Sequence, residues 1–206
     1  MNTTNINMKS ENAVWHNETV TRKDRQYKNG HKGVTLWLTG LSGAGKSTVA
    51  HALEEKLHQL SCQAIVLDGD NVRHGLCGDL GFSDEDRKEN IRRSGELSKI
   101  FTHAGMITLS AFISPFHEDR EVVRGLLDDG DFIEVYCSAP LHVCEKRDVK
   151  GMYKKARAGI IQNYTGITSP YQAPLKPDLV LETATESIET SVEKVMQLLR
   201  QRNIIS

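Results

Sequence analysis

The sequence predicts a three-layer α/β/α fold in which a mostly parallel, five-stranded sheet lies between helices. Short apolar runs rich in β-branched residues alternate along the chain with longer segments whose apolar residues recur at helical spacing. This alternation indicates βαβ units with right-handed crossovers, and therefore a parallel sheet with helices on both faces. A glycine-rich turn that joins the first apolar run to the first helical segment is typical of one subclass of this fold.

Length and composition favour one domain with a short appendage. The chain has 206 residues, a net charge of −1 and 38% hydrophobic residues. This near-neutral charge gives no reason to expect binding to nucleic acid or to an anionic membrane. No apolar run approaches the ~20 residues that span a bilayer, and the first residues lack the apolar core of a secretory signal. The four cysteines show no zinc-binding spacing, so we expect reduced thiols and a cytoplasmic protein.

The first elements in chain order are a polar arm and a single domain that follows it. Residues 1–30 are polar and mixed in charge, with Trp15 as the only large apolar anchor. We expect this arm to have little structure of its own and to lie over the core or over a second subunit. Residues 31–206 form the predicted domain.

The elements of this domain follow from the apolar pattern. A serine followed three residues later by an acidic residue, Ser83 and Asp86, predicts a helix start. Ser114 and Pro115 predict another, with serine as N-cap and proline in the first turn. The predicted strands are 34–38, 64–67, 106–113, 132–137 and 179–181, and the predicted helices are 46–60, 83–105, 115–127, 140–147 and a last one from 188 to 199.

The most specific motif is the GxxxxGK[ST] turn, which has a predicted strand before it and a predicted helix after it. Its glycines allow backbone N–H groups to curl around a phosphate, next to the positive end of a helix dipole. The lysine reaches the β- and γ-phosphates, and the last hydroxyl is a ligand for Mg²⁺. We therefore predict a nucleoside triphosphate site formed by Gly40, Leu41, Ser42, Gly43, Ala44, Gly45, Lys46 and Ser47. The guanine-reading NKxD motif of GTPases does not occur.

Polar residues are dense after the second predicted strand and along the next helix. The carboxyl ends of parallel strands meet at one edge of the sheet, so these residues should face the same cleft as the glycine-rich turn. Arg73, Arg87 and Arg93 indicate an anionic second substrate, because the arginine fork matches phosphate or sulfate oxygens. The alternative for the helical members is a solvated helix face.

Several sequence segments together resemble one known enzyme family, and the resemblance covers residues 13 to 202. The chain resembles adenylylsulfate kinases of the short, stand-alone bacterial form, including Val14-Trp15-His16 near its start. Besides the glycine-rich turn, the segments that occur in the same order as in that family are DGDNVRHGL, DLGFS, DRKENIRR, AFISPF, CEKRDVKGMYKKARAG, YTGI and SPYQAP.

The resemblance implies a P-loop kinase that uses MgATP to phosphorylate the 3′-hydroxyl of adenosine 5′-phosphosulfate (APS) in sulfate assimilation. It also implies a homodimer and a mobile lid at about 148–170. The sequence also leaves two alternatives open, a nucleoside monophosphate-type kinase and a regulatory module that binds nucleotide without transfer chemistry. The three functions differ in the acceptor that triggers ADP release from ATP: APS, a nucleoside monophosphate, or neither.

Carried over residue by residue, the resemblance implies the following roles. Arg147 would lie against the ATP adenine, and Asp68 or Asp70 would help to hold Mg²⁺ or orient the attacking hydroxyl. Tyr164 stands where the family usually has phenylalanine, so its added hydroxyl needs a partner. The implied catalytic set is Ser114, Lys46 and Asp70, the metal ligand is Ser47, and the implied APS site is Asp70, Arg73, Phe82, Arg87, Asn90, Ile113, Ser114, Lys150 and Tyr164.

Ser114 has three interpretations. It aligns with the serine described in this family as a phosphoserine intermediate, which would make the chain a phosphoprotein. It is also a good N-cap. Thirdly, it could position the substrate during direct in-line transfer, which needs little covalent help from the protein. No nearby residue in the sequence is an obvious base to activate it, as a nucleophilic serine requires.

Overall fold

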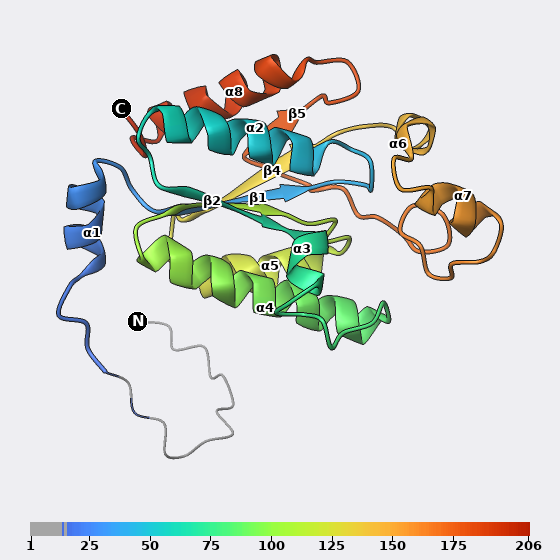
Figure 1. Cartoon of the computed structure of the whole chain (residues 1–206), viewed down its shortest axis with the longest axis horizontal. Coiled ribbons are helices and arrows are strands. Elements are labelled where there is room, and N and C mark those ends of the chain that lie inside the picture. Colours follow the sequence, from blue (N-terminus) through green and yellow to red (C-terminus); the bar gives the residue numbers. More distant parts are fainter. Residues whose placement is uncertain (1–13, 15) are drawn as a thin grey trace.

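The computed structural model describes residue 14 and residues 16–206, and it contains one five-stranded, all-parallel sheet (Figure 1). The strand order is β2-β3-β1-β4-β5, so the first strand is central and β2 and β5 form the edges. This confirms the predicted fold class and all five predicted strands. Their bounds are β1 Val34–Thr39, β2 Ala64–Asp68, β3 Ile107–Ala111, β4 Phe132–Cys137 and β5 Leu179–Leu181.

Helices cover both faces of this sheet, as predicted (Figure 1). One face is covered by α2 (Lys46–Gln59) and α8 (Ile188–Gln201), which contact each other. The other face is covered by α4 (Asp84–His103) and α5 (His117–Leu126), which also pack together. The shorter helices α3 (Gly69–Arg73), α6 (Leu141–Arg147) and α7 (Met152–Arg157) follow the carboxyl ends of β2 and β4.

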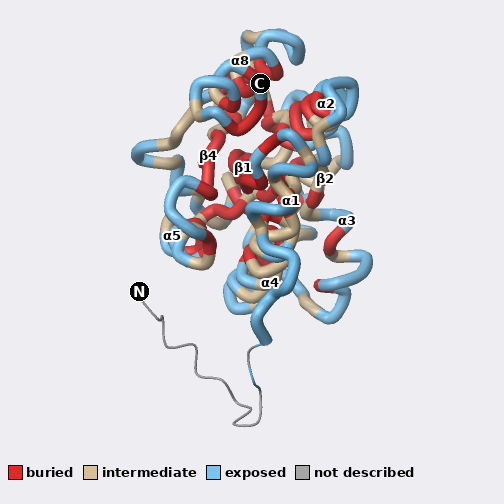
Figure 2. The backbone as a smooth tube through the Cα atoms, turned by 90° about the vertical axis from the view of Figure 1, so that its left-hand side faces the viewer, coloured by how far each residue is buried: buried red, intermediate tan, exposed pale blue. Residues whose placement is uncertain are grey.

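The core has two apolar layers with β1 between them. Every residue of β1 is buried, as expected of a central parallel strand (Figure 2). Leu36 and Leu38 belong to the layer under α2 and α8. Trp37 belongs to the opposite layer and stacks on Phe112 and Phe132, with ring centroids 5.1 and 6.2 Å away. The sheet is therefore rigid where its carboxyl edge carries the predicted site.

The prediction that residues 1–30 have little structure is wrong for part of the arm, because α1 spans Arg22–Asn29. Thr21 and Asp24 form a reciprocal capping box at its start. Arg22 then anchors the helix to the domain through two hydrogen bonds to the Asp131 carboxylate, of 2.5 and 2.6 Å. This tertiary partner lies 109 residues away, so composition alone does not reveal it. Trp15 lies outside the described residues.

Local caps also explain the two short helices that the sequence analysis missed. The Asp68 side chain accepts the backbone N–H of Asp70 and starts α3. The Asp148 carboxylate accepts the N–H groups of Tyr153 and Lys154 at 3.0 Å and starts α7. Both are five- or six-residue helices that show no apolar periodicity.

The predicted N-cap role of Ser114 is wrong. Helix α5 begins at His117 with Phe116 as its N-cap. Ser114 instead has a left-handed backbone with a φ of 38°, which a non-glycine residue rarely adopts. In the described part of the chain, no helix is both long and apolar enough to cross a membrane.

Candidate active site

The glycine-rich turn lies between β1 and α2, as predicted, and its glycines are needed for steric reasons. Gly40 has a φ of 151°, and a Cβ placed there would lie 2.5 Å from the carbonyl oxygen of Cys137. Gly45, the N-cap of α2, has a φ of 91° and offers no side-chain cap to the helix. The first N–H groups of α2 are therefore left to an external acceptor, which is the arrangement that binds a phosphate.

Lys46 is buried in the turn, and among the described residues its hydrogen-bond partners are neutral. Its Nζ donates to the carbonyl oxygens of Gly40 and Leu41, at 3.0 and 2.8 Å. Burial lowers the pKa of Lys46 from 10.5 to about 8. A buried ammonium whose hydrogen-bond partners are neutral is costly, and a bound polyphosphate would remove that cost.

Ser47 and Asp68 place two oxygen ligands side by side at the start of α2. The Ser47 hydroxyl donates to Asp68 Oδ2 at 2.5 Å, and Asp68 is buried at the end of β2. A hydroxyl and a carboxylate are hard oxygen donors of the kind that Mg²⁺ prefers, so the pair fits the implied metal. Asp70 lies two residues farther along, in α3, and its exposed carboxylate contacts Lys150 from the lid. Of the two aspartates, Asp68 therefore fits the metal better.

Arg147 lies on the nucleotide side, where it reaches the turn from the end of α6. Its guanidinium donates to the carbonyl oxygens of Gly43 and Thr183, at 3.1 and 2.6 Å. Thr183 in turn donates its hydroxyl to the carbonyl oxygen of Ala44 at 2.7 Å. Thr183 supports the turn from the segment after β5. The sequence did not identify Thr183 as a site residue. The signal that could have identified it is its polar side chain, two residues after the end of a predicted strand.

Arg73 and Arg87 lie on the opposite side, and their hydrogen-bond partners in the described part of the chain are all neutral. Arg73 donates to the carbonyl oxygen of Gly81 at 2.8 Å, and its guanidinium lies 4.4 Å from the centre of the Phe82 ring. Arg87 donates to the carbonyl oxygen of Phe82 at 3.1 Å and to Thr165 Oγ1 at 3.0 Å. Burial lowers the pKa of both arginines. Both are thus half-buried cations that form no ion pair within the part of the chain that the structure describes.

Arg93 differs from these two because it has carboxylate partners, which favours the alternative of a solvated helix face for this residue. Its guanidinium forms ion pairs with Asp79 at 2.7 Å and with Glu89 at 2.8 Å. Both carboxylates raise the pKa of Arg93. Spacing along the helix could not separate Arg93 from Arg87, because the Asp79 partner lies on the preceding loop.

Asn90, Phe82 and Tyr164 complete the acceptor side. Asn90 is buried in α4, and its Nδ2 is one of the few buried polar atoms in the described residues without a hydrogen-bond partner. Such an atom is costly unless a ligand satisfies it. The Phe82 ring is 64% exposed. Tyr164 packs edge-on against Tyr153, and its hydroxyl finds a partner in the Ser42 side chain, which partly offsets the burial that raises the pKa of Tyr164.

Ser114 is buried beside Thr39, the residue that precedes the glycine-rich turn. Its hydroxyl accepts a hydrogen bond from Trp37 Nε1 at 3.0 Å and donates one to Thr39 Oγ1 at 3.1 Å. Thr39 donates to the carbonyl oxygen of Ile113 at 2.7 Å, which holds the end of β1 against the end of β3. Neither partner of the Ser114 hydroxyl is a base.

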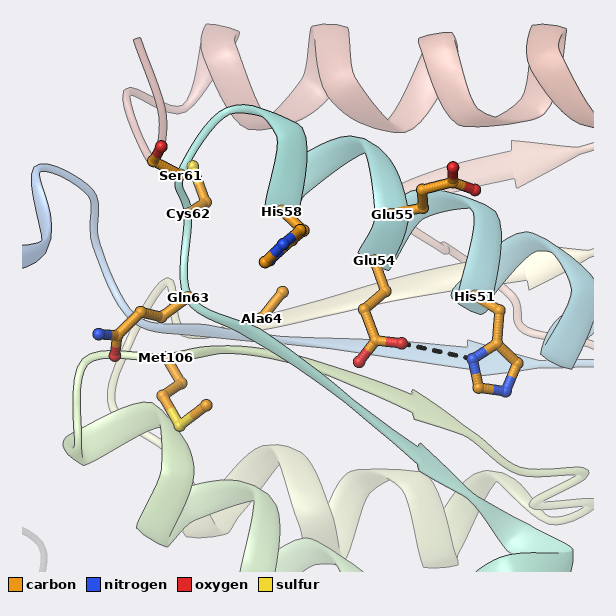
Figure 3. Close-up of a pocket in the computed structure, with 9 residues that line it drawn as sticks. All are labelled: His51, Glu54, Glu55, His58, Ser61, Cys62, Gln63, Ala64 and Met106. Atoms are coloured by element: carbon orange, nitrogen blue, oxygen red, sulfur yellow. Dashed lines mark hydrogen bonds and ion pairs between the residues drawn. The ribbon is translucent and has the colours of Figure 1, made fainter.

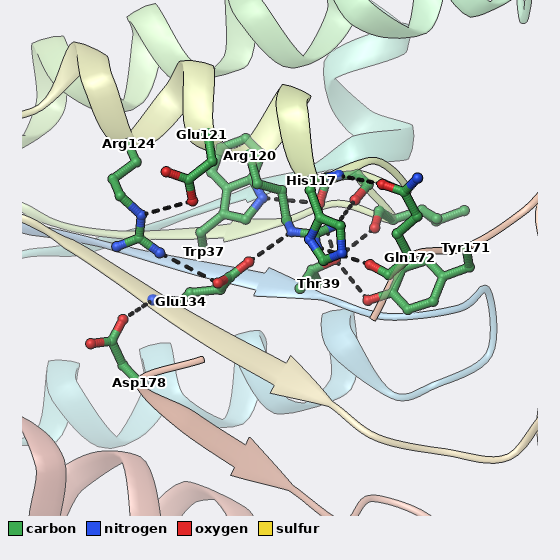
Figure 4. A network of polar contacts seen from close by, with 12 residues as sticks. Trp37, Thr39, His117, Arg120, Glu121, Arg124, Glu134, Tyr171, Gln172 and Asp178 are labelled. Atoms are coloured by element: carbon green, nitrogen blue, oxygen red, sulfur yellow. Dashed lines mark hydrogen bonds and ion pairs between the residues drawn. The ribbon is translucent and has the colours of Figure 1, made fainter. Parts of the chain in front are cut away.

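Arg120 holds the strained corner at Ser114 and is the main feature that the sequence analysis missed. It is 1% exposed, donates to the Ser114 carbonyl oxygen at 2.7 Å and pairs with Glu134 at 2.7 Å (Figure 4). A third hydrogen bond reaches the carbonyl oxygen of Gln172 at 2.9 Å. Arg120 thereby ties β4 and the segment after the lid to the corner between β3 and α5.

An open groove of about 770 Å³ lies elsewhere, between α2 and the start of β2 (Figure 3). It is at the amino edge of the sheet, whereas the glycine-rich turn, Asp68 and Ser114 lie at the carboxyl edge. Glu54 already caps the edge strand by accepting the Val66 N–H at 3.0 Å, and it lies 3.4 Å from His51. Within the described residues, no group of three or more potential metal ligands is found. We therefore assign the candidate site to the carboxyl edge.

Comparisons with known proteins agree with this assignment. A family model described as adenylylsulphate kinase matches residues 32–182. An adenylyl-sulfate kinase of Acaryochloris marina is 59% identical over 198 residues, which are 96% of this chain and 97% of that protein. One from Staphylococcus carnosus is 54% identical over 198 residues, 96% of this chain and all of that protein.

Among solved structures, an APS kinase of Mycobacterium tuberculosis in complex with AMPPNP and APS superimposes with a TM-score of 0.78. It is 47% identical, and the match covers 82% of this chain and 99% of that one. A hexameric APS kinase from Thiobacillus denitrificans matches with a TM-score of 0.66 and 29% identity, over 88% of this chain and 32% of that one.

Proposed function

The chain belongs to the adenylylsulphate kinase family, and from that premise we propose how its residues perform the reaction. The enzyme transfers a phosphoryl group from ATP to the 3′-hydroxyl of APS. The observation that carries the assignment of roles is the charge pattern at the carboxyl edge. A buried lysine and two half-buried arginines lie there, and their hydrogen-bond partners among the described residues are all neutral.

The ATP side is the loop 40–47 together with Arg147. The N–H groups of the loop hold the β-phosphate, and the Lys46 ammonium follows the γ-phosphoryl group, where its charge stabilises the transfer. Arg147, at the entrance to the loop, lies against the adenine. The two phosphate-binding roles are supported by the open N-terminus of α2 and by the neutral hydrogen-bond partners of Lys46.

We also propose that Ser47 and Asp68 would hold Mg²⁺, which when bound would neutralise charge on the ATP phosphates. Asp70 is then free for the acceptor. Its exposed carboxylate, on α3 just beyond the metal ligands, is suited to orient the attacking 3′-hydroxyl, and Lys150 from the lid already contacts it in this structure.

The acceptor side holds the phosphosulfate group and the second adenine. Arg73 and Arg87 supply positive charge to the phosphosulfate, and Asn90 Nδ2 supplies a donor that now lacks a partner. Phe82 and Tyr164 would hold the adenine between their rings, with Ile113 on the sheet side.

Transfer then requires positioning more than covalent chemistry. We propose that Ser114 positions the acceptor and does not carry the phosphoryl group. Its hydroxyl is buried, donates to Thr39 and lacks a base, whereas a nucleophilic serine requires one. Arg120 is the positioning residue that fixes this corner.

Acceptor-dependent ADP release tests the proposal. We expect release from MgATP in the presence of APS, and none with a nucleoside monophosphate or without an acceptor. Release with a monophosphate alone would instead indicate a monophosphate kinase, and binding without release would indicate a regulatory module. We further propose that the protein is a homodimer, which light scattering of the purified protein tests through its molar mass. We also propose that it is cytoplasmic, which fractionation of the cells tests.

A further inference from the structure

The turn formed by residues 163–166 lies between the two substrate sides and contacts both. From the acceptor side, Arg87 reaches the carbonyl oxygen of Asn163 and the hydroxyl of Thr165. From the ATP side, Leu41 comes so close that a Cβ on Gly166 would lie 3.0 Å from its side chain. Gly166 has a φ of 89°, so a larger residue could not take this place. The turn cannot shift without disturbing one side or the other.

Tyr153 connects this turn to the phosphate loop through a single side chain. It comes from α7 in the lid and is 2% exposed. Its hydroxyl donates to the carbonyl oxygen of Ser42 at 2.9 Å. Its ring packs edge-on against Tyr164, with centroids 5.0 Å apart and an interplanar angle of 80°. A tyrosine has only two side-chain torsions, so fixing its hydroxyl also fixes its ring.

Tyr164 approaches Ser42 as well. The Ser42 side chain lowers the pKa of Tyr164 against the larger effect of burial, so it lies near the Tyr164 hydroxyl, while the Tyr153 hydroxyl donates to the Ser42 carbonyl oxygen at 2.9 Å. Ser42 therefore holds Tyr153 directly, and Tyr153 in turn packs against Tyr164. A nucleotide that orders the backbone at Ser42 would order the Tyr153 and Tyr164 rings with it.

We propose that Tyr153 is a positioning residue that couples nucleotide binding to APS binding. Ser42 sets the position of Tyr153, and Tyr153 sets the position of the Tyr164 ring; the inference rests on the proposed stacking of Tyr164 on the APS adenine. Because binding linkage is reciprocal, APS strengthens nucleotide binding by the same factor by which the nucleotide strengthens APS binding.

Titration calorimetry tests this coupling without turnover. Mg-AMPPNP and APS are each titrated alone and then in the presence of a saturating amount of the other, and the ratio of the two APS dissociation constants is the coupling factor. Tyr153→Phe keeps the ring and removes only the hydroxyl. Loss of one neutral hydrogen bond should lower the coupling factor about threefold to tenfold, with little change in the affinity for Mg-AMPPNP alone.

Two further variants make the result interpretable. Tyr164→Phe should lower the coupling factor by about twofold, since it removes only the weaker contact with Ser42. Tyr27→Phe is the control, because the Tyr27 side chain is exposed on α1, and it should leave the factor unchanged. Thermal melts show whether all three variants are folded. If Tyr153→Phe does not fold, the coupling factor of Tyr164→Phe tests the inference instead, and an unchanged factor there would contradict it.

The inference is overturned if wild type shows no coupling, or if Tyr153→Phe weakens both ligands alone and leaves the coupling factor intact. The latter would mean a merely structural role. APS-dependent ADP release is measured on the same wild-type preparation. Its absence would refute the proposed function, whereas release with an unaltered coupling factor would refute this inference alone.

Discussion

The two edges of the sheet use arginines of similar exposure in opposite ways. At the amino edge, Arg22 pairs with Asp131 and Arg202 pairs with Asp178, each at 2.5 Å. At the carboxyl edge, Arg73 and Arg87 are equally half-buried, yet their hydrogen-bond partners among the described residues are carbonyl and hydroxyl oxygens. Lys46 is buried at the same edge, and it too donates to carbonyl oxygens, those of Gly40 and Leu41.

This difference distinguishes paired cations, which stabilise the fold through a carboxylate, from unpaired cations, which are suited to bind an anionic ligand. A buried charge is tolerated when a carboxylate compensates it, and it is costly when only neutral groups do. A chain gains nothing in stability from the second arrangement, so the anion that compensates it must come from outside. Removing a paired cation should therefore damage stability, and removing an unpaired one should damage substrate use.

The largest effect is expected for Lys46→Ala. Its kcat should fall by about 10³-fold, or ~4 kcal/mol, because a charge aimed at the transferring phosphoryl group is lost. Its melting temperature should stay the same or rise, since an uncompensated buried ammonium is removed. Steady-state kinetics and a circular dichroism melt measure both. Lys56→Ala, an exposed residue on the same helix, is the control; a Lys46→Ala enzyme that keeps a tenth of wild-type kcat would contradict the role.

Arg120→Met tests the paired class. Breaking the buried pair leaves the Glu134 carboxylate with only the more distant Arg124, at 3.3 Å, and the free energy of unfolding should fall by ~3 kcal/mol. Denaturant unfolding measures it. The double variant Arg120→Met/Glu134→Leu should recover most of that loss, because the remaining charge is gone as well. If the double variant is no more stable than the single one, the pair is not what Arg120 contributes.

Arg87→Ala should weaken substrate binding and leave the stability nearly unchanged, the opposite of what is expected for Arg120→Met. The affinity for APS should fall by about 30-fold, or ~2 kcal/mol, at the low end for a charged partner because Arg87 is only half-buried. The affinity for ATP and the stability should change little. Calorimetric titration of each ligand decides between the two sides. Arg92→Ala, an exposed arginine on the same helix that pairs with Glu89, should leave both affinities unchanged; an equal loss for both ligands in Arg87→Ala would place Arg87 elsewhere.

Most of the sheet and of the ATP side could be predicted from the sequence, because both depend on local signals. A run such as 34–38 is apolar on both faces only in a buried strand, and GxxxxGK[ST] imposes its own geometry. The positive φ values of Gly40 and Gly45 are what that motif requires. Helix α4 could be placed from its cap at Ser83 for the same reason.

The features that could not be predicted depend on partners distant in sequence. Arg93 and Arg87 look alike along α4, and only the folded loop shows that Asp79 neutralises one of them. Helix α1 needs Asp131, and the corner at Ser114 needs Arg120 and Trp37. The Ser-Pro pair has a good local signal for an N-cap, but these tertiary hydrogen bonds override it.

A pH titration tests the unpaired class on wild-type protein. The pKa of Lys46 is about 8 in the free enzyme, against 10.5 for an exposed lysine. A triphosphate requires the charged form, so affinity for Mg-AMPPNP should be constant below about pH 8 and weaken above it, by up to about tenfold per pH unit. Below pH 8 the buried charge costs stability in full, and that cost is relieved between pH 8 and 10.5, where the unfolded chain binds more protons than the folded one.

Proton uptake makes this prediction specific to Lys46. Nucleotide binding at pH 8.5 to 9 should take up a fraction of a proton, measured by calorimetry in buffers of different ionisation enthalpy. Lys46→Arg keeps the charge at every accessible pH, so its uptake should vanish. Uptake of the same size in Lys46→Arg would assign the titration to another group.

The smallest effect is expected for Ser114→Ala, where two roles for one hydroxyl make opposite predictions. If the hydroxyl carried the phosphoryl group, turnover would disappear and a chiral γ-phosphate would be transferred with retention, after two displacements. If it positions the acceptor, transfer is direct and the configuration inverts. The structure favours the second role because the hydroxyl is held between Trp37 and Thr39, and the corner is fixed through the Ser114 carbonyl oxygen, which the alanine variant keeps. We therefore expect Ser114→Ala to lose ~1 kcal/mol of stability and to keep kcat within about tenfold of wild type. Retention at phosphorus in the wild-type reaction would refute direct transfer, whatever the activity of the variant.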